Sequence, residues 1–90
     1  MREIILDCTS IHDRASFHGQ LAEAMDFPEW YGKNLDALHD CLTDICGETV
    51  LRLLHWGAAE TALGSYGKAA ARVMEEADLE NPDFSVEYYD

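Results

Sequence analysis

The chain has 90 residues, of which 48% are hydrophobic, and its formal net charge is −12 because 18 Asp and Glu residues outnumber 6 Lys and Arg residues. Its length suffices for one modest hydrophobic core, so we expect a single domain over residues 1–90. The charge argues against binding to nucleic acid or to an anionic membrane, because both require basic residues. With no signal-peptide pattern and an odd number of cysteines, the sequence predicts a cytoplasmic protein with reduced thiols.

The first elements predicted are a strand and a helix. Residues 3–7 form a short apolar run bounded by charges, which predicts a buried strand. Cap-forming residues at positions 9, 10 and 13 then precede a segment with helical periodicity that extends to about Met25. Pro28 cannot continue a helix, so a loop is expected over residues 28–33.

A second helix is predicted after this loop, with Asn34 as its N-cap and Gly47 as its end. Strands separated by helical segments favour a parallel sheet. The chain is therefore expected to form an α/β fold with a three-stranded parallel sheet and about four helices. The later elements expected are a strand, two helices and a strand, at residues 49–54, 56–63, 68–79 and 84–89.

Apolar and acidic residues separate onto opposite sides of the predicted second helix. At about 100° per residue, Asp36, Asp40 and Asp44 line one side. Like charges at this spacing destabilise an isolated helix, so the row favours a cationic partner as much as it favours a tolerated solvated surface. The apolar stripe on the other side consists of Leu35, Leu38, Leu42 and Ile45.

Two further features accompany this acidic row. Acidic residues concentrate in two segments, 23–48 and 75–90, which would form one acidic surface if the fold brought them together. Trp30 and Tyr31 lie in the loop before the helix, and exposed aromatic residues beside charges are typical of protein-binding surfaces. We expect one of the two rings to point inward and the other outward.

The run from Pro28 to Thr43, PEWYGKNLDALHDCLT, resembles the signature of the barstar family, which is P-E-Y-Y-G-x-N-L-D-A-L-W-D-C-L-T or close to it. The predicted order of elements also resembles the barstar-like fold along the whole chain. The resemblance implies a protein that inhibits a microbial guanyl-type ribonuclease by covering its basic active-site cleft with the second helix and the loop before it. The implied partner is a basic extracellular-type ribonuclease or a toxin ribonuclease domain, bound 1:1 by a monomer.

The resemblance also implies which residues contact the partner. Asp40 matches the carboxylate that occupies the phosphate-binding place of the ribonuclease, and a cleft that holds phosphate suits such a mimic. Three positions depart from the family pattern: His39 replaces a common tryptophan, Asp44 a common glycine and Ile45 a common aromatic residue. The implied contact residues are Trp30, Asn34, Asp36, His39, Asp40, Thr43, Asp44 and, by a weaker alignment, Glu76.

Two other classes of function remain open from the residues. The chain could be an acidic module for another basic protein, such as a toxin immunity or regulatory protein. It could also be a small metal-binding or enzymatic domain, but Cys41 and Cys46 lack zinc-ligand spacing and no nucleophile or phosphate-loop motif is present. We therefore expect a protein that is not an enzyme and that has no cofactor or metal.

Overall fold

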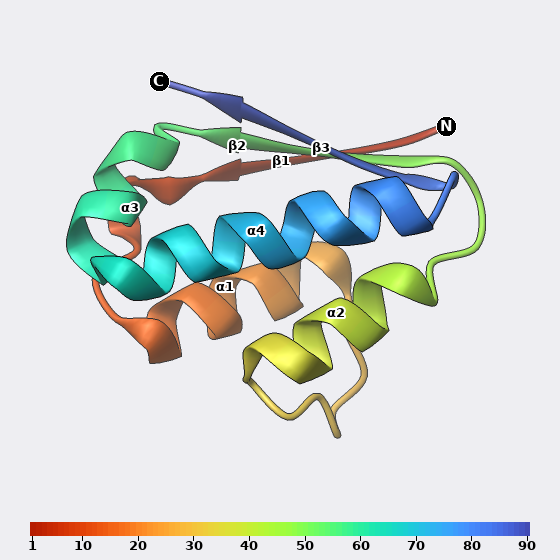
Figure 1. The fold of residues 1–90 in the computed structure, drawn as a ribbon, viewed down its shortest axis with the longest axis horizontal. Coiled ribbons are helices and arrows are strands. Elements are labelled where there is room, and N and C mark those ends of the chain that lie inside the picture. The colour runs from red at the N-terminus through yellow and green to blue at the C-terminus, as the bar shows by residue number, and fades with distance from the viewer.

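Three strands and four α-helices make up the chain in the order that its apolar segments predict. The computed structural model describes all 90 residues. Its strands form a three-stranded parallel sheet with helices packed on it, which confirms the α/β fold (Figure 1). The elements are β1 (Arg2–Asp7), the short 3-10 helix η1 (Cys8–Ser10), α1 (Arg14–Met25), α2 (Leu35–Thr43), β2 (Thr49–Leu54), α3 (Trp56–Leu63), α4 (Ser65–Glu80) and β3 (Phe84–Tyr89).

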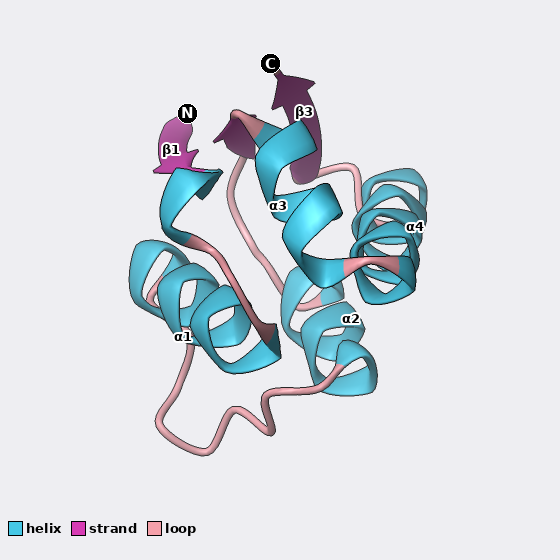
Figure 2. Cartoon of the chain, turned by 90° about the vertical axis from the view of Figure 1, so that its left-hand side faces the viewer, coloured by secondary structure: helices cyan, strands magenta, loops and turns pink.

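The sheet has the strand order β1-β2-β3, and the helices lie on one side of it (Figure 1 and Figure 2). The register places Leu51 of β2 beside Ile4 of β1 and Val86 of β3. Leu51 and Leu53 are fully buried because they point from the central strand toward the helices. Burial of β2 follows from its position between two hydrogen-bonded neighbours.

The prediction of a buried first strand is wrong for one of its two faces. Ile4 is buried, whereas the side chain of Ile5 is 57% exposed. β1 is an edge strand, and its outward side chains lie on the sheet face that no helix covers. On that face Arg52 of β2 forms ion pairs with Glu3 of β1 and Glu87 of β3. These pairs link the three strands where no apolar layer covers them.

Local caps set the limits of α1. The carboxylate of Asp13 accepts a hydrogen bond from the Ser16 backbone N–H at 2.7 Å, and the Ser16 hydroxyl accepts one from the Asp13 N–H at 3.1 Å. This reciprocal capping box satisfies two backbone donors that the helix itself leaves free. The helix ends at Asp26, whose φ of 58° lies in the left-handed region. It therefore ends two residues before Pro28, which the sequence suggests as the stop.

Helix α4 begins at Ser65, earlier than the predicted start at Lys68. Two glycines lie between the two predicted helices, and only Gly64 has a positive φ, of 63°. Gly67 is helical, and a Cβ on it would lie 3.0 Å from the Cα of Glu60. The second glycine therefore permits the close approach of α3 and α4 rather than a turn.

Helix α2 lies farther from the sheet than α1 and α4, and it packs against α4 (Figure 2). Leu38 and Leu42 are fully buried, while Leu35 and Ile45 pack against the core from partly buried positions. The apolar stripe predicted for this helix is thus the surface that it buries. Since α2 forms the outer layer, its opposite side is left to the solvent.

Candidate protein-binding surface

The loop that precedes α2 directs one aromatic ring outward and the next inward, as expected from the sequence. The side chain of Trp30 is 79% exposed, whereas Tyr31 is 6% exposed. The Tyr31 N–H donates to the carbonyl of Pro28 at 2.9 Å, which tightens the turn. The Tyr31 ring packs against Phe27, with 4.8 Å between ring centroids. The buried Tyr31 therefore anchors the loop, and Trp30 next to it extends into the solvent.

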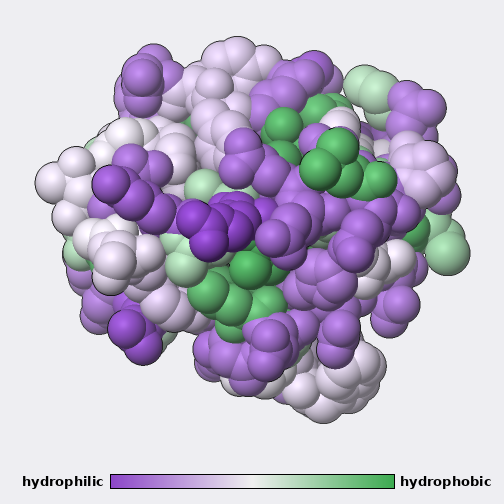
Figure 3. All heavy atoms as spheres, viewed as in Figure 1, coloured by the Kyte–Doolittle hydropathy of each residue, from purple (hydrophilic) through white to green (hydrophobic).

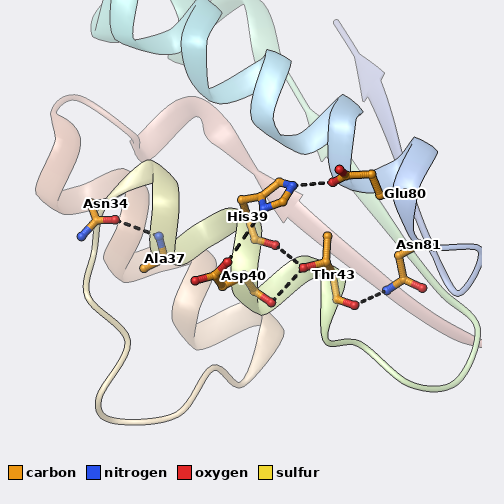
Figure 4. A network of polar contacts seen from close by, with 7 residues as sticks. All are labelled: Asn34, Ala37, His39, Asp40, Thr43, Glu80 and Asn81. Carbon is orange, nitrogen blue, oxygen red and sulfur yellow. Dashed lines mark hydrogen bonds and ion pairs between the residues drawn. The ribbon is translucent and has the colours of Figure 1, made fainter.

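Asn34 is the N-cap of α2, as predicted. Its side-chain oxygen accepts a hydrogen bond from the Ala37 N–H at 2.8 Å (Figure 4). Its amide nitrogen donates to the Gly32 carbonyl at 3.2 Å. Asn34 remains exposed. Its first role is to start the helix, and one amide hydrogen and one lone pair of the amide oxygen remain free for other contacts.

The three aspartates of α2 form an exposed row on the side opposite the buried leucines. Asp36 lies in the first turn, where the helix dipole favours a negative charge. Asp40 is the most central, and its side chain is 83% exposed. Asp44 is the C-cap residue because the helix ends at Thr43, before the predicted end at Gly47. No basic residue occupies the last turn, so the charge of Asp44 opposes the dipole.

His39 lies between the acidic residues of α2 and those of α4. Its Nε2 contacts a carboxylate oxygen of Glu80, and its Nδ1 is 3.9 Å from Asp40 (Figure 4). The hydrogen bond to Glu80 raises the pKa of His39, with smaller contributions from the charges of Glu80, Asp40 and Glu76. The two acidic segments of the sequence therefore meet at His39, and together they form an acidic surface that consists of Asp36, Asp40, Asp44, Glu76 and Glu80.

Thr43 and Asn81 hold the C-terminal end of α2. The Thr43 hydroxyl donates to the carbonyl of His39 at 2.9 Å, within the helix. Asn81, directly after α4, is buried, and its amide nitrogen donates to the carbonyls of Leu42 at 2.9 Å and Ile45 at 3.0 Å. It also lies 3.3 Å from the carbonyl of Thr43 (Figure 4). These bonds satisfy carbonyls that the end of a helix leaves free. The row of aspartates is thus carried by a helix fixed at both ends.

Glu80 and Asn81 were missed by the sequence analysis. Glu80 is the last residue of α4 and Asn81 is its C-cap, and both lie far from α2 in the sequence. An asparagine that follows a helix carries no local sign of which distant carbonyls its side chain will meet. Seen from the side of α2 and α4, the surface is mainly hydrophilic, with a few small hydrophobic areas (Figure 3).

A hollow of about 260 Å³ lies beside Trp30, between the loop and the end of α2. The side chain of Arg2 reaches this region and donates to the Met25 carbonyl at 3.0 Å, at the end of α1. The hollow is shallow and open, and it combines charged and apolar groups. Its lining residues are Arg2, Met25, Asp26, Phe27, Pro28, Trp30, Cys41, Asp44, Ile45 and Cys46.

The three cysteines are free thiols that differ in how deeply they are buried. Cys8 is buried, Cys41 is partly buried and Cys46 is exposed, and all three are free thiols. Burial raises the pKa of the Cys8 thiol to about 11. Nowhere do three or more His, Cys, Asp or Glu side chains gather in a way that could hold a metal ion. No helix combines the length and the apolar character that crossing a membrane requires.

The fold and the surface together define a class: a small α/β protein with a barstar-like fold, whose outermost helix carries an exposed acidic row. The family model described as "Barstar (barnase inhibitor)" matches residues 1–89, and the chain belongs to this family. It is also 39% identical over 84 residues to a Bacillus subtilis (strain 168) protein named "Putative ribonuclease inhibitor YrdF", and the match covers 92% of each chain.

Proposed function

We propose that this protein inhibits a basic microbial ribonuclease of the guanyl type by placing α2 and the preceding loop in its active-site cleft. The observation that carries the proposal is the exposed row of Asp36, Asp40 and Asp44 on a helix that is held at both ends. A ribonuclease cleft is built from cations that hold phosphate, and a preformed row of carboxylates can replace the phosphates at little ordering cost.

The family and the relative's name support an inhibitory role, and the surface supports protein binding rather than catalysis. Asp40 would take the central phosphate place, because it lies in the middle of the row and is highly exposed in the free protein. Trp30 would cover an adjacent part of the partner, since its ring is exposed. We further propose a 1:1 complex in the cytoplasm, where the protein would protect its host or act as immunity protein to a toxin ribonuclease.

The proposal is tested by titrating the purified protein into guanyl-type ribonucleases, including the product of any neighbouring gene, with a fluorescent RNA substrate. Cleavage should stop at one equivalent, and the protein itself should stay intact. Undiminished cleavage at excess protein across these enzymes would contradict the proposal. A complex with a basic protein that is not a ribonuclease would instead support an acidic module of different specificity.

A further inference from the structure

A buried polar centre joins α1, the loop before α2 and the start of α4. His18 of α1 is 1% exposed, and both of its ring nitrogens have a phenol partner. Its Nδ1 lies 2.7 Å from the hydroxyl of Tyr31, and its Nε2 lies 2.5 Å from that of Tyr66. Neither the acidic surface nor the hydrophobic core explains why a histidine with two hydrogen bonds occupies this position.

Burial of the two phenols determines which nitrogen carries the proton. Tyr31 is buried, and His18 is the sole hydrogen-bond partner of its hydroxyl. A buried donor without an acceptor is costly, so the Tyr31 O–H must donate to Nδ1. The Nε2–H of His18 then donates to the hydroxyl oxygen of Tyr66, which is partly exposed and can direct its own hydrogen to water.

His18 stays neutral in this arrangement. Burial lowers its pKa, and the charge of Lys33 in the nearby loop lowers it further. A second proton would have to occupy Nδ1, where the Tyr31 hydroxyl already donates. The hydrogen bond between Tyr31 and His18 therefore depends on a single tautomer of a neutral imidazole.

The same bond holds the loop that presents Trp30. Trp30 is exposed and makes no hydrogen bond with the rest of the chain, so its position depends on its neighbours. Tyr31 is the next residue and extends inward, between Phe27 and His18. Without its hydroxyl bond, Tyr31 would keep its apolar contacts but lose the directional contact that fixes the depth and angle of the loop.

We propose that His18 is a positioning residue for ribonuclease binding: through its Nδ1 it fixes Tyr31, and through Tyr31 it fixes the loop that carries Trp30. This inference rests on the function proposed above, but its structural half concerns the free protein alone. His18 itself is buried and touches no partner, so its effect on binding must pass through the loop.

The structural half is tested by NMR on the free protein. Nitrogen-15 spectra of the imidazole should show His18 as the Nε2–H tautomer at neutral pH, and an Nδ1–H tautomer would overturn the assignment. Tyr31→Phe should increase backbone mobility over residues 28–33. The control is Tyr88→Phe, which likewise removes one hydroxyl hydrogen bond. The hydroxyl of Tyr88, a partly buried residue, donates to the Ala71 carbonyl at 3.1 Å. Equal loop mobility in both variants would overturn the proposal.

The binding half uses the complex with the ribonuclease. Tyr31→Phe should dissociate about fivefold faster than the wild type, because the complex must then hold in place a loop that the protein no longer orders by itself. Tyr88→Phe should stay within about twofold of the wild type, since it lies outside the loop. Equal rates for the two variants would show that loop position does not matter. If the wild type bound no ribonuclease, the proposed function would fail, while the NMR result would still decide whether His18 fixes the loop.

Discussion

His39 and Asp40 are adjacent in the sequence and have opposite electrostatic roles on the acidic surface. When protonated, His39 compensates part of the negative charge where α2 meets α4, through its pair with Glu80. Asp40 makes no close ion pair. The nearest basic nitrogen, His39 Nδ1, lies 3.9 Å from its carboxylate. Its carboxylate is therefore available to a partner, whereas the imidazole is already engaged.

Asp40→Ala should weaken binding to the ribonuclease more than any other single change on α2. Removal of the central carboxylate would leave cations of the partner buried and unpaired, which typically costs about 2–5 kcal/mol, or about 30-fold or more in affinity. Most of the loss should appear as faster dissociation, measured by stopped-flow competition.

The matched control is Glu23→Ala, which removes one exposed carboxylate on α1, beside Leu6 of the edge strand and away from α2. It should change dissociation by less than about twofold. Both variants should keep the thermal midpoint of the wild type or raise it slightly, because each removes a charge from an acidic protein. Binding of Asp40→Ala within twofold of the wild type would refute its role as a phosphate mimic.

The His39–Glu80 pair should make stability depend on pH. Because Glu80 raises the folded-state pKa of His39 above its usual value of about 6.5, the stabilisation is fully present below about pH 6.5 and is lost as the pH rises through the raised pKa. The free energy of unfolding of the wild type should exceed that of Glu80→Gln at about pH 5.5, and the difference should shrink by about pH 8.5.

An NMR titration of the His39 ring provides the direct check on this pair. Glu80→Gln should lower the pKa of His39, and Glu76→Gln, which removes a charge that acts more weakly on the imidazole, should lower it less. A His39 pKa that does not respond to Glu80→Gln would show that the contact does not persist in solution.

At the scale of elements, α2 is short, and its stability comes from its neighbours rather than from its own sequence. The helix has 9 residues, below the length at which isolated helices are stable in water. Asn34 caps its first turn, Asn81 satisfies carbonyls at its end, and Leu38 and Leu42 anchor its inner side. A helix that is already formed binds without the cost of ordering it.

Asn81→Ala should destabilise the protein by about 1–3 kcal/mol, because it leaves buried carbonyls of α2 without a donor. Asn81→Asp should be at least as destabilising. It keeps the oxygen that accepts from the Asp83 N–H at 2.9 Å but directs a carboxylate oxygen at the same carbonyls. Urea unfolding measures the free energy of unfolding of both variants. If Asn81→Asp were as stable as the wild type, the bonds from Asn81 to α2 would contribute nothing to stability.

Two helical glycines provide a matched test of the contact between α3 and α4. Gly67→Ala should lower the free energy of unfolding by about 1–2 kcal/mol, because the clash with the Glu60 backbone outweighs the better helix propensity of alanine. Gly19→Ala in α1 should raise it by about 0.5–1 kcal/mol, since nothing lies within 4 Å of its added Cβ. Thermal or urea unfolding measures the change in the free energy of unfolding for both variants. If Gly67→Ala stabilised the protein, close packing of α3 against α4 at this position would be ruled out.

At the scale of the whole molecule, the net charge of −12 is distributed unevenly. Packing of α2 against α4 unites two acidic segments of the sequence into one surface. Arg52, in contrast, pairs with Glu3 and Glu87 on the uncovered face of the sheet. The acidic surface should therefore dominate the electric field that an approaching basic partner meets.

Association with the ribonuclease should be fast and strongly dependent on salt. Charge concentrated on one surface should raise the association rate constant toward roughly 10⁸ M⁻¹s⁻¹ at low ionic strength, with a steep fall as salt is added. Stopped-flow mixing across ionic strengths measures this, and Glu23→Ala should leave the slope nearly unchanged. A flat salt dependence would mean that the acidic surface does not guide the encounter.

The sequence by itself determined the order of the elements, the parallel sheet, the cap of α2 at Asn34 and the separation of its leucines from its aspartates. These features depend on residues within a few positions of one another, through helical periodicity and local hydrogen bonds. It also predicted that one ring of Trp30 and Tyr31 would point inward. The contacts of the site residues with a partner remain a prediction.

Only the tertiary structure decided what joins these elements. The bonds of Asn81 to α2, the pairing of His39 with Glu80 and the contact of His18 with Tyr31 link residues that are distant in the sequence. Each depends on how helices cross and how deep they pack, which no local pattern records. The exposure of Ile5 has the same origin, because an apolar run does not reveal that helices cover only one face of the sheet.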